Sequence, residues 1–206
     1  MAWRLQPRLR TWPPLALTLF AAAVAALCVL ALGLWGPTRT PPPTLILSGD
    51  GHPYAYARGA ERLIAGAHKR IWMLMYVIHM EEKGEEGPVN GLMQALAAAA
   101  ARGVHVQVAL DLGEPAKFGQ EPDLKHVEAE RWLYAHGIHV MLDEPNRTTH
   151  AKVMIVDDSI VLMGSHNWTR SAIVENREAS VVLSDAGIAK DLEDYCASVP
   201  GWDPTY

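Results

Sequence analysis

The stretch HAKVMIVDDSIVLMGSHNWT, residues 150–169 of this 206-residue chain, sets several polar side chains among strand-forming apolar residues. Side chains alternate across a strand, so His150 and Lys152 project from the same face of a first predicted strand. The triplet at 157–159, Asp-Asp-Ser, is typical of a tight turn. The apolar run IVLM at 160–163 then predicts a second strand that is buried on both faces. The stretch therefore predicts a β-hairpin at the centre of a sheet.

Strand and helix patterns alternate outward from this hairpin. We expect helices over 54–68, 88–102, 122–136 and 185–197, and further strands over 45–48, 70–80, 104–112, 138–144 and 178–184. The composition is 50% hydrophobic, which is enough to bury a core in a domain of this length. Such alternation predicts an α/β domain with a mixed central sheet covered by helices.

Polar side chains gather where the two hairpin strands begin and end. His150 and Lys152 open the first strand, and Ser165 and Asn167 emerge in the loop after the second. An ammonium and an amide bind phosphate oxygens, and a neutral imidazole can attack phosphorus to form a covalent intermediate. A second, protonated histidine would donate to the leaving oxygen, and a twofold homodimer would supply it. The pattern therefore favours phosphodiester chemistry.

These residues carry a family resemblance. HAKVMIVD (150–157) resembles the HxKxxxxD signature of the phospholipase D superfamily, and GSHNWT (164–169) resembles the segment that follows it there. NRE (176–178) falls where the family places a further acidic residue. The chain is most similar to bacterial single-motif nucleases and the mitochondrial cardiolipin hydrolase group. The resemblance implies a phospholipase D-like α/β/α sandwich over residues 45–206.

The resemblance also implies a role for each polar residue. His150 corresponds to the nucleophile, and the partner's His150 to the general acid. Glu178 corresponds to the acid that orients the histidine. Asp157 belongs to the catalytic signature, but we interpret it as mainly structural. The residues that would bind the substrate phosphate are Lys152, Ser165 and Asn167. No metal and no cofactor is implied.

An apolar segment precedes this domain. Residues 15–34 contain no charged side chain, and 20 such residues are about the length that crosses a bilayer as a helix. We expect a basic N-terminus over 1–14, a transmembrane helix or signal anchor over 15–35, and a Pro-rich linker over 36–44. Three arginines precede the segment and Arg39 alone lies in the stretch just after it, which places the N-terminus in the cytoplasm and the domain outside. The alternative is a cleaved signal peptide and a secreted domain.

Charge bears on the choice of substrate. Residues 44–206 contain all 23 acidic residues and 14 of the 18 basic ones, a net charge of −9 with neutral histidines. An acidic domain is a poor general binder of nucleic acid. We therefore favour a phospholipid head group as substrate, and an endonuclease with the same site is the alternative. A non-catalytic membrane-anchored binding protein is a third hypothesis, against which the complete catalytic set argues.

Overall fold

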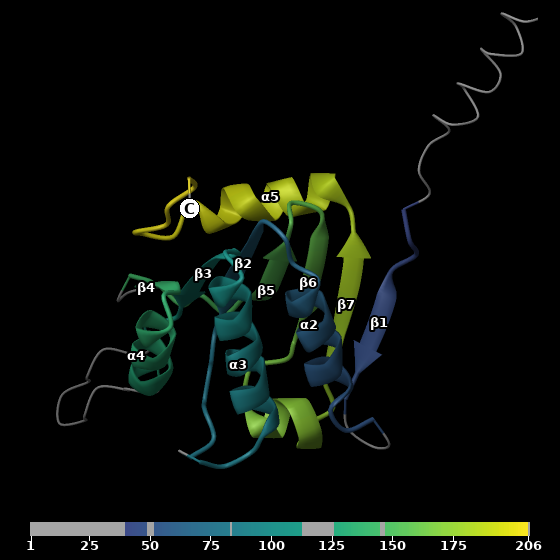
Figure 1. The fold of residues 1–206 in the computed structure, drawn as a ribbon. Helices are drawn as coiled ribbons and strands as arrows, with labels where there is room; N and C mark the ends of the chain where they lie inside the picture. Colours follow the sequence, from purple (N-terminus) through teal and green to yellow (C-terminus); the bar gives the residue numbers. More distant parts are fainter. Residues whose placement is uncertain (1–39, 49–51, 83, 113–125, 145–146, 206) are drawn as a thin grey trace, which may run out of the picture. The chain divides into compact units, whose positions relative to one another are not determined.

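A seven-stranded mixed sheet in the order β1-β7-β6-β5-β2-β3-β4 organises residues 41–206 (Figure 1). The computed structural model describes residues 40–48, 52–82, 84–112, 126–144 and 147–205. The strands are β1 (Thr44–Leu47), β2 (Arg70–Met75), β3 (His105–Leu110), β4 (His139–Leu142), β5 (Lys152–Val156), β6 (Ile160–Gly164) and β7 (Ala179–Ser184). β2, β3 and β4 are parallel, and every other pair of neighbours is antiparallel.

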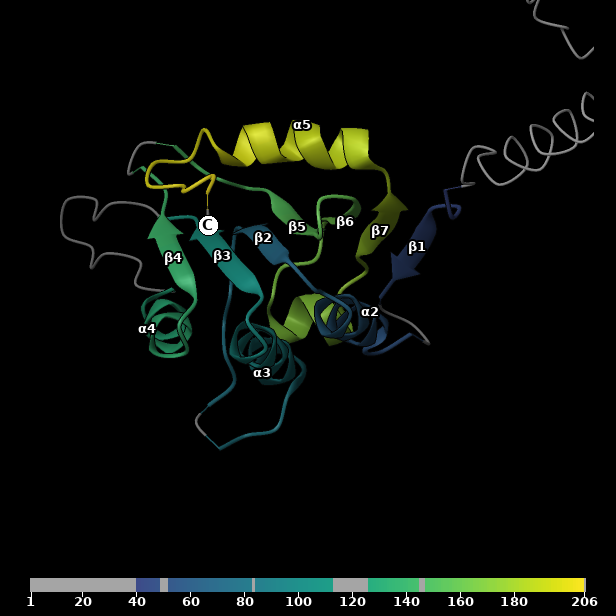
Figure 2. The same ribbon diagram turned by 45° about the horizontal axis from the view of Figure 1, so that its top comes forward.

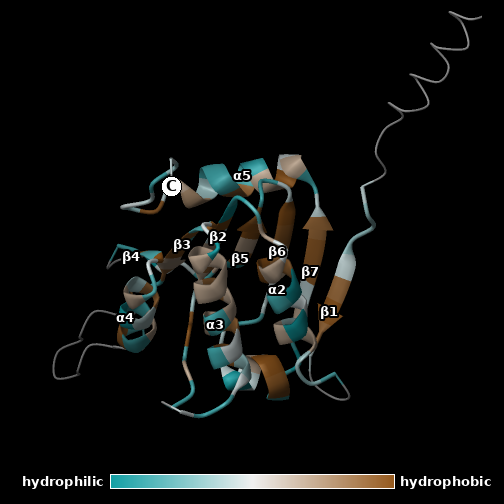
Figure 3. Cartoon of the chain, viewed as in Figure 1, coloured by the Kyte–Doolittle hydropathy of each residue, from teal (hydrophilic) through white to brown (hydrophobic). Residues whose placement is uncertain are grey.

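Helices cover both faces of the sheet. α2 (Ala55–Ala65), α3 (Pro88–Ala101) and α4 (Val127–Ala135) lie on one face, and α5 (Ala186–Cys196) lies on the other (Figure 2). Each face has its own buried apolar cluster, since the side chains of a strand alternate between faces. The strands are mostly coloured as hydrophobic in Figure 3, whereas α5 carries long hydrophilic stretches. The expected α/β/α sandwich with a mixed sheet is confirmed for this domain.

The predicted hairpin is formed by β5 and β6. Its turn contains Asp157 and Asp158 at φ 49° and 65°, a left-handed conformation that aspartate tolerates better than most residues. The Asp157 carboxylate accepts hydrogen bonds from the backbone N–H groups of His68 (2.8 Å), Lys69 (2.7 Å) and Arg70 (3.2 Å). The hairpin turn is thereby joined to the start of β2.

Some elements differ from the sequence-based expectations. β2 ends at Met75 rather than at residue 80, because the chain leaves the sheet there and Ile78 pairs with Trp168 in an isolated bridge. A π-helix, η1 (Ser171–Glu175), was not predicted. The described part of the helix expected over 122–136 is α4. The expected membrane segment lies outside the described residues, and no helix within them is both long and apolar enough to cross a bilayer.

Candidate active site

One end of the sheet collects most of the predicted site residues. β5 runs antiparallel to both β2 and β6, and its register places Lys152 opposite Met75. β7 runs antiparallel to β6, with Gly164 opposite Ser180. The segments just before β5, just after β6 and just before β7 therefore meet at one end of the strands. This end, at the lower end of β7 in Figure 1, carries His150, Lys152, Ser165, Asn167 and Glu178.

The candidate nucleophile lies against a tyrosine. The His150 side chain is exposed, and its ring centroid is 4.4 Å from that of Tyr76. The Lys152 Nζ donates to the His150 carbonyl oxygen at 2.7 Å and lies 4.5 Å from the centre of the Tyr76 ring. Burial lowers the pKa of Lys152, while Glu178 and Asp111 act in the opposite direction. A partly desolvated cation next to an open imidazole suits a phosphate, because its charge is less screened by water.

Glu178 is held by hydrogen bonds from within the same chain. Its carboxylate accepts from the Ser165 hydroxyl and from the Asn176 side-chain amide, the latter at 3.2 Å. Ser165 Oγ also accepts from the Ala179 backbone N–H at 3.1 Å. Within the described part of the chain, no hydrogen bond joins Glu178 to His150. The role of Glu178 in orienting the histidine therefore stays a prediction.

Two buried rings fix the loop at 164–168. Trp168 is 1% exposed and donates its indole N–H to the Tyr56 hydroxyl at 3.2 Å. His166 is fully buried, stacks on Tyr56 with ring centroids 4.3 Å apart, and places Nδ1 2.7 Å from Ser180 Oγ. Burial lowers the pKa of His166 to about 4, so this imidazole is neutral at neutral pH. Sequence reasoning had assigned no role to His166.

Asn167 lies on this fixed loop between the two buried rings. Its side-chain oxygen is buried and has no hydrogen-bond partner among the residues that the structure describes. This oxygen accepts hydrogen bonds and cannot pair with a phosphate oxygen, which is also an acceptor. The predicted contact between Asn167 and a substrate phosphate would instead use the side-chain NH2 group as donor, and it stays a prediction.

Two buried carboxylates position the residue before the nucleophile. Asp111 accepts the Thr149 backbone N–H at 2.8 Å, and Asp143 accepts the Thr149 hydroxyl. Both acids are buried and directly follow a parallel strand, β3 or β4. Sequence reasoning missed them, although one aspartate after each apolar run, in VALD and VMLD, was an available signal. Together they fix the backbone that carries His150.

Asp157 does not lie with the other predicted site residues. It follows β5 directly, whereas His150 precedes β5, so the length of the strand separates them. Its three backbone hydrogen bonds lead to the residues just before and at the start of β2. This geometry gives Asp157 a bracing position in the fold, away from the candidate nucleophile.

Comparison with known protein families identifies one match that includes the site. Residues 61–199 match the family described as "Cardiolipin synthase, PLD-like domain". The chain also resembles the solved structure of Nuc, a phospholipase D family member from Salmonella typhimurium. That similarity has a TM-score of 0.60 and 25% sequence identity, and it covers 76% of this chain and 93% of Nuc.

Curated proteins with similar sequences are longer than the matched region. The chain is 33% identical over 105 residues to the mitochondrial cardiolipin hydrolase of Mus musculus. This match covers 50% of this chain and 44% of that protein. It is 34% identical over 96 residues to phospholipase D of Rickettsia bellii (strain RML369-C), which covers 46% of this chain and 43% of that protein. The match thus spans less than half the length of each relative.

Proposed function

The chain belongs to the phospholipase D superfamily, and from this premise we propose that it is a metal-independent phosphodiesterase acting as a homodimer. A phospholipid head group is the favoured substrate. The observation that carries the proposal is the exposed His150 imidazole beside the buried Lys152 ammonium. Ser165 and Glu178, joined by a hydrogen bond, lie at the same end of the strands.

The proposed reaction has two steps. His150 attacks the phosphorus atom, and the bond to the leaving-group oxygen breaks as that oxygen takes a proton from the partner's His150. The partner's His150 then removes a proton from water, and the resulting hydroxide displaces the phosphoryl group from His150. Lys152 would neutralise the charge on the nonbridging oxygens, and the Asn167 side-chain NH2 group would donate hydrogen bonds to them. The Ser165 hydroxyl would donate as well once it turns from Glu178 to the phosphate.

Several observations support a lipid substrate over the alternatives. The uncharged segment at 15–34 and the net charge of −9 on residues 44–206 favour a membrane lipid over a polyanion. Two curated relatives are named as a cardiolipin hydrolase and a phospholipase D. An endonuclease with the same site is the second candidate, which the resemblance to small single-motif nucleases favours. A non-catalytic membrane-anchored binding protein is the third.

We further propose that residues 15–35 anchor the chain, with the N-terminus in the cytoplasm and the catalytic domain on the other side. A protease added outside intact cells should then digest the domain. If the segment is instead a cleaved signal, the mass of the mature protein would show its loss, and the domain would be secreted.

The substrate test uses the full chain in detergent and EDTA, offered phosphatidylcholine, cardiolipin and single-stranded DNA side by side. His150→Asn is the catalytic variant. His105→Asn is its matched control, because His105 is an exposed histidine at the start of β3, at the opposite end of the sheet. We expect release of a head group or phosphatidic acid by the wild type and the control, and none by His150→Asn.

Other outcomes of this test are equally informative. Cutting of DNA alone would make the protein an endonuclease. If no substrate is turned over and no phosphohistidine is trapped after rapid quenching, the phosphodiesterase proposal is wrong and the binding-protein hypothesis takes its place.

A mixing experiment tests the homodimer. Wild-type and His150→Asn chains are unfolded together, refolded at varied ratios and assayed. If each reaction needs the histidines of both subunits, activity should follow the square of the wild-type fraction. A linear dependence, or a monomeric mass for the active species in sedimentation, would contradict the two-histidine mechanism.

A further inference from the structure

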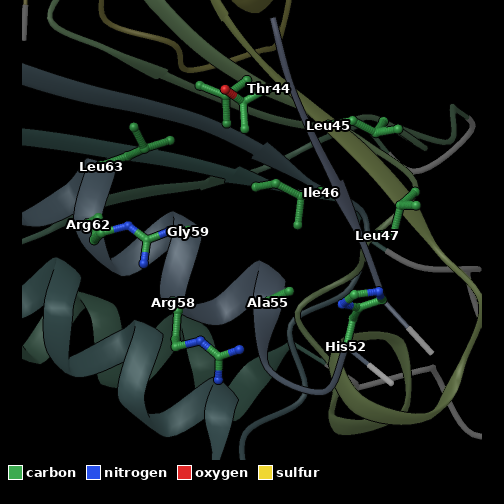
Figure 4. Close-up of a pocket in the computed structure, with 11 residues that line it drawn as sticks. Thr44, Leu45, Ile46, Leu47, His52, Ala55, Arg58, Gly59, Arg62 and Leu63 are labelled. Carbon is green, nitrogen blue, oxygen red and sulfur yellow. The ribbon is translucent and has the colours of Figure 1, made fainter. Parts of the chain in front are cut away.

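A hollow between edge strand β1 and helix α2 shares no residue with the candidate active site (Figure 4). Its volume is about 490 Å³. The side chains of Arg58 and Arg62 reach it from α2, and His52 reaches it from the preceding segment, whereas no acidic residue lines it. This absence is notable because residues 44–206 carry a net charge of −9. The hollow is therefore a local basic site on an acidic domain.

Exposed leucines lie on the strand that forms one wall of this hollow. Leu45 is 64% exposed and Leu47 is 45% exposed. Ile46, between them, turns toward α2 and is buried, so the two leucines project from the face of β1 that is turned away from α2. Within the described part of the chain, β1 pairs with β7 alone, so its outer edge carries no strand. Leucines on an open sheet edge favour association with another apolar surface.

The arginines have donors available for a phosphate. Arg58 and Arg62 are both exposed, and one Arg58 nitrogen donates to the Pro53 carbonyl at 3.2 Å. A guanidinium has five N–H donors in a planar fork, so Arg58 keeps others for a ligand. Two such groups one helical turn apart, at positions i and i+4, can contact the same anion.

We propose that this edge, made of β1 and the outward face of α2, binds the membrane surface through anionic phospholipid head groups. The membrane meets β1 edge-on: the head-group phosphate lies between Arg58 and Arg62 on one side of the strand, and Leu45 and Leu47 enter the interfacial layer on the other side. Basic groups next to exposed apolar side chains are the pattern that binds anionic membrane surfaces.

The position of β1 in the chain supports a membrane as the occupant. Nine residues, 35–43, join the uncharged segment at 15–34 to β1. A Pro-rich linker in the polyproline II conformation extends by about 3.1 Å per residue, so nine such residues span roughly 28 Å. If residues 15–34 lie in the bilayer, as the proposed anchoring requires, β1 is held within that distance of the membrane surface.

Two other occupants fit the surface less well. A second copy paired through the same edge would bring the arginines of both chains together, because a twofold interface uses the same patch on each subunit. A nucleic acid would satisfy the arginines but would leave the leucines in water. The combined chemistry therefore favours an anionic lipid surface.

The test places an environment-sensitive NBD fluorophore at Leu45→Cys in the full chain with Cys28→Ala, where the remaining Cys196 is buried. The protein is reconstituted in vesicles of phosphatidylcholine, with or without phosphatidylglycerol. We expect a blue shift of the emission only when phosphatidylglycerol is present, decreasing with added salt. Arg58→Gln with Arg62→Gln should abolish the shift.

A matched control has the same change in net charge at the opposite sheet edge. Arg131→Gln with Arg147→Gln alters exposed arginines on α4 and beyond β4, and it should keep the shift.

Equal emission in both vesicles, or an unchanged shift in the Arg58/Arg62 variant, would overturn the proposal. A shift that follows protein density instead of phosphatidylglycerol would assign the edge to a second copy, and one produced by a DNA oligonucleotide would assign it to nucleic acid. Turnover plays no part in the readout, so loss of the proposed enzymatic function would leave this inference standing.

Discussion

Tyr76 contacts both the candidate nucleophile and its neighbouring cation: its ring centre lies 4.4 Å from the His150 ring centroid and 4.5 Å from the Lys152 Nζ. Tyr76 is the first residue after β2, and the last residue of that strand, Met75, pairs with Lys152. The sheet register therefore sets the position of the tyrosine relative to both groups. We infer that Tyr76 is a positioning residue for His150 and Lys152.

Replacing Tyr76 with alanine should slow turnover more than Tyr76→Phe, which keeps the ring. A cation–aromatic contact is worth about 0.5–2 kcal/mol, which corresponds to roughly a 2- to 30-fold change in rate. The measurement is kcat and KM on a phosphodiester substrate. A positioning role predicts a lower kcat with the ring removed; equal rates for the alanine and phenylalanine variants would contradict it.

Asp157→Asn should destabilise the domain with little effect on turnover by the folded fraction. Burial alone raises the pKa of Asp157, but the N–H donors of Lys69, His68 and Arg70 outweigh it and bring the pKa below its ordinary value. Hydrogen bonds to a charged group are worth about 1.5–3 kcal/mol, and an amide accepts them more weakly than a carboxylate.

The pH dependence of this effect has a defined sign. Because the folded-state pKa of Asp157 is lowered, its stabilisation is present above the ordinary aspartate pKa and is lost as the pH falls through the folded value. Denaturant unfolding of wild type and Asp157→Asn at several pH values measures this. Asp191→Asn, at an exposed position on α5, is the control. Equal free energies of unfolding for wild type and Asp157→Asn at neutral pH would contradict the bracing role.

Because His166 is held neutral in the folded state, the domain should lose stability as mild acid protonates this histidine in the unfolded chain. Its folded-state pKa of about 4 lies below the ordinary value of 6.5, so the unfolded chain binds the proton more readily. Stability is therefore full above about pH 6.5 and decreases as the pH falls through 4, by up to about 3 kcal/mol from this group. Denaturant unfolding followed by tryptophan fluorescence, in wild type and His166→Gln, should show a smaller acid loss in the variant. Parallel pH profiles for the two proteins would show that His166 does not contribute.

Gly164→Ala should destabilise the domain and disturb the loop that carries Ser165. A Cβ at Gly164 would lie 2.5 Å from Ser180 Cα, in the backbone of β7, which cannot rotate away. Overpacking of this kind costs about 1–3 kcal/mol or more. Gly66→Ala is the control, because its nearest neighbour would be at 3.4 Å and its φ of −82° suits alanine. A thermal midpoint for Gly164→Ala equal to that of Gly66→Ala would contradict the close approach of β6 and β7.

The sequence alone was enough to predict the hairpin, the order of strands and helices, and the residues of the motif. Strand alternation places His150 and Lys152 on one face whatever surrounds them. Turn-forming residues at 157–159 and glycines at 103 and 137 set the ends of elements through local backbone preference. These are short-range properties, and for that reason a reading of neighbouring residues recovers them.

Which distant residues support the site follows from the tertiary structure and not from local sequence. The order β5-β2-β3-β4 brings the ends of three parallel strands beside the start of β5, and so places Tyr76, Asp111 and Asp143 around Thr149 and His150. The residues next to Asp111 in VALD and to Asp143 in VMLD do not specify that Thr149 will be the hydrogen-bond partner of both acids. Sheet order depends on how the helices pack on the two faces, and this packing is set by the whole core rather than by any one stretch of sequence.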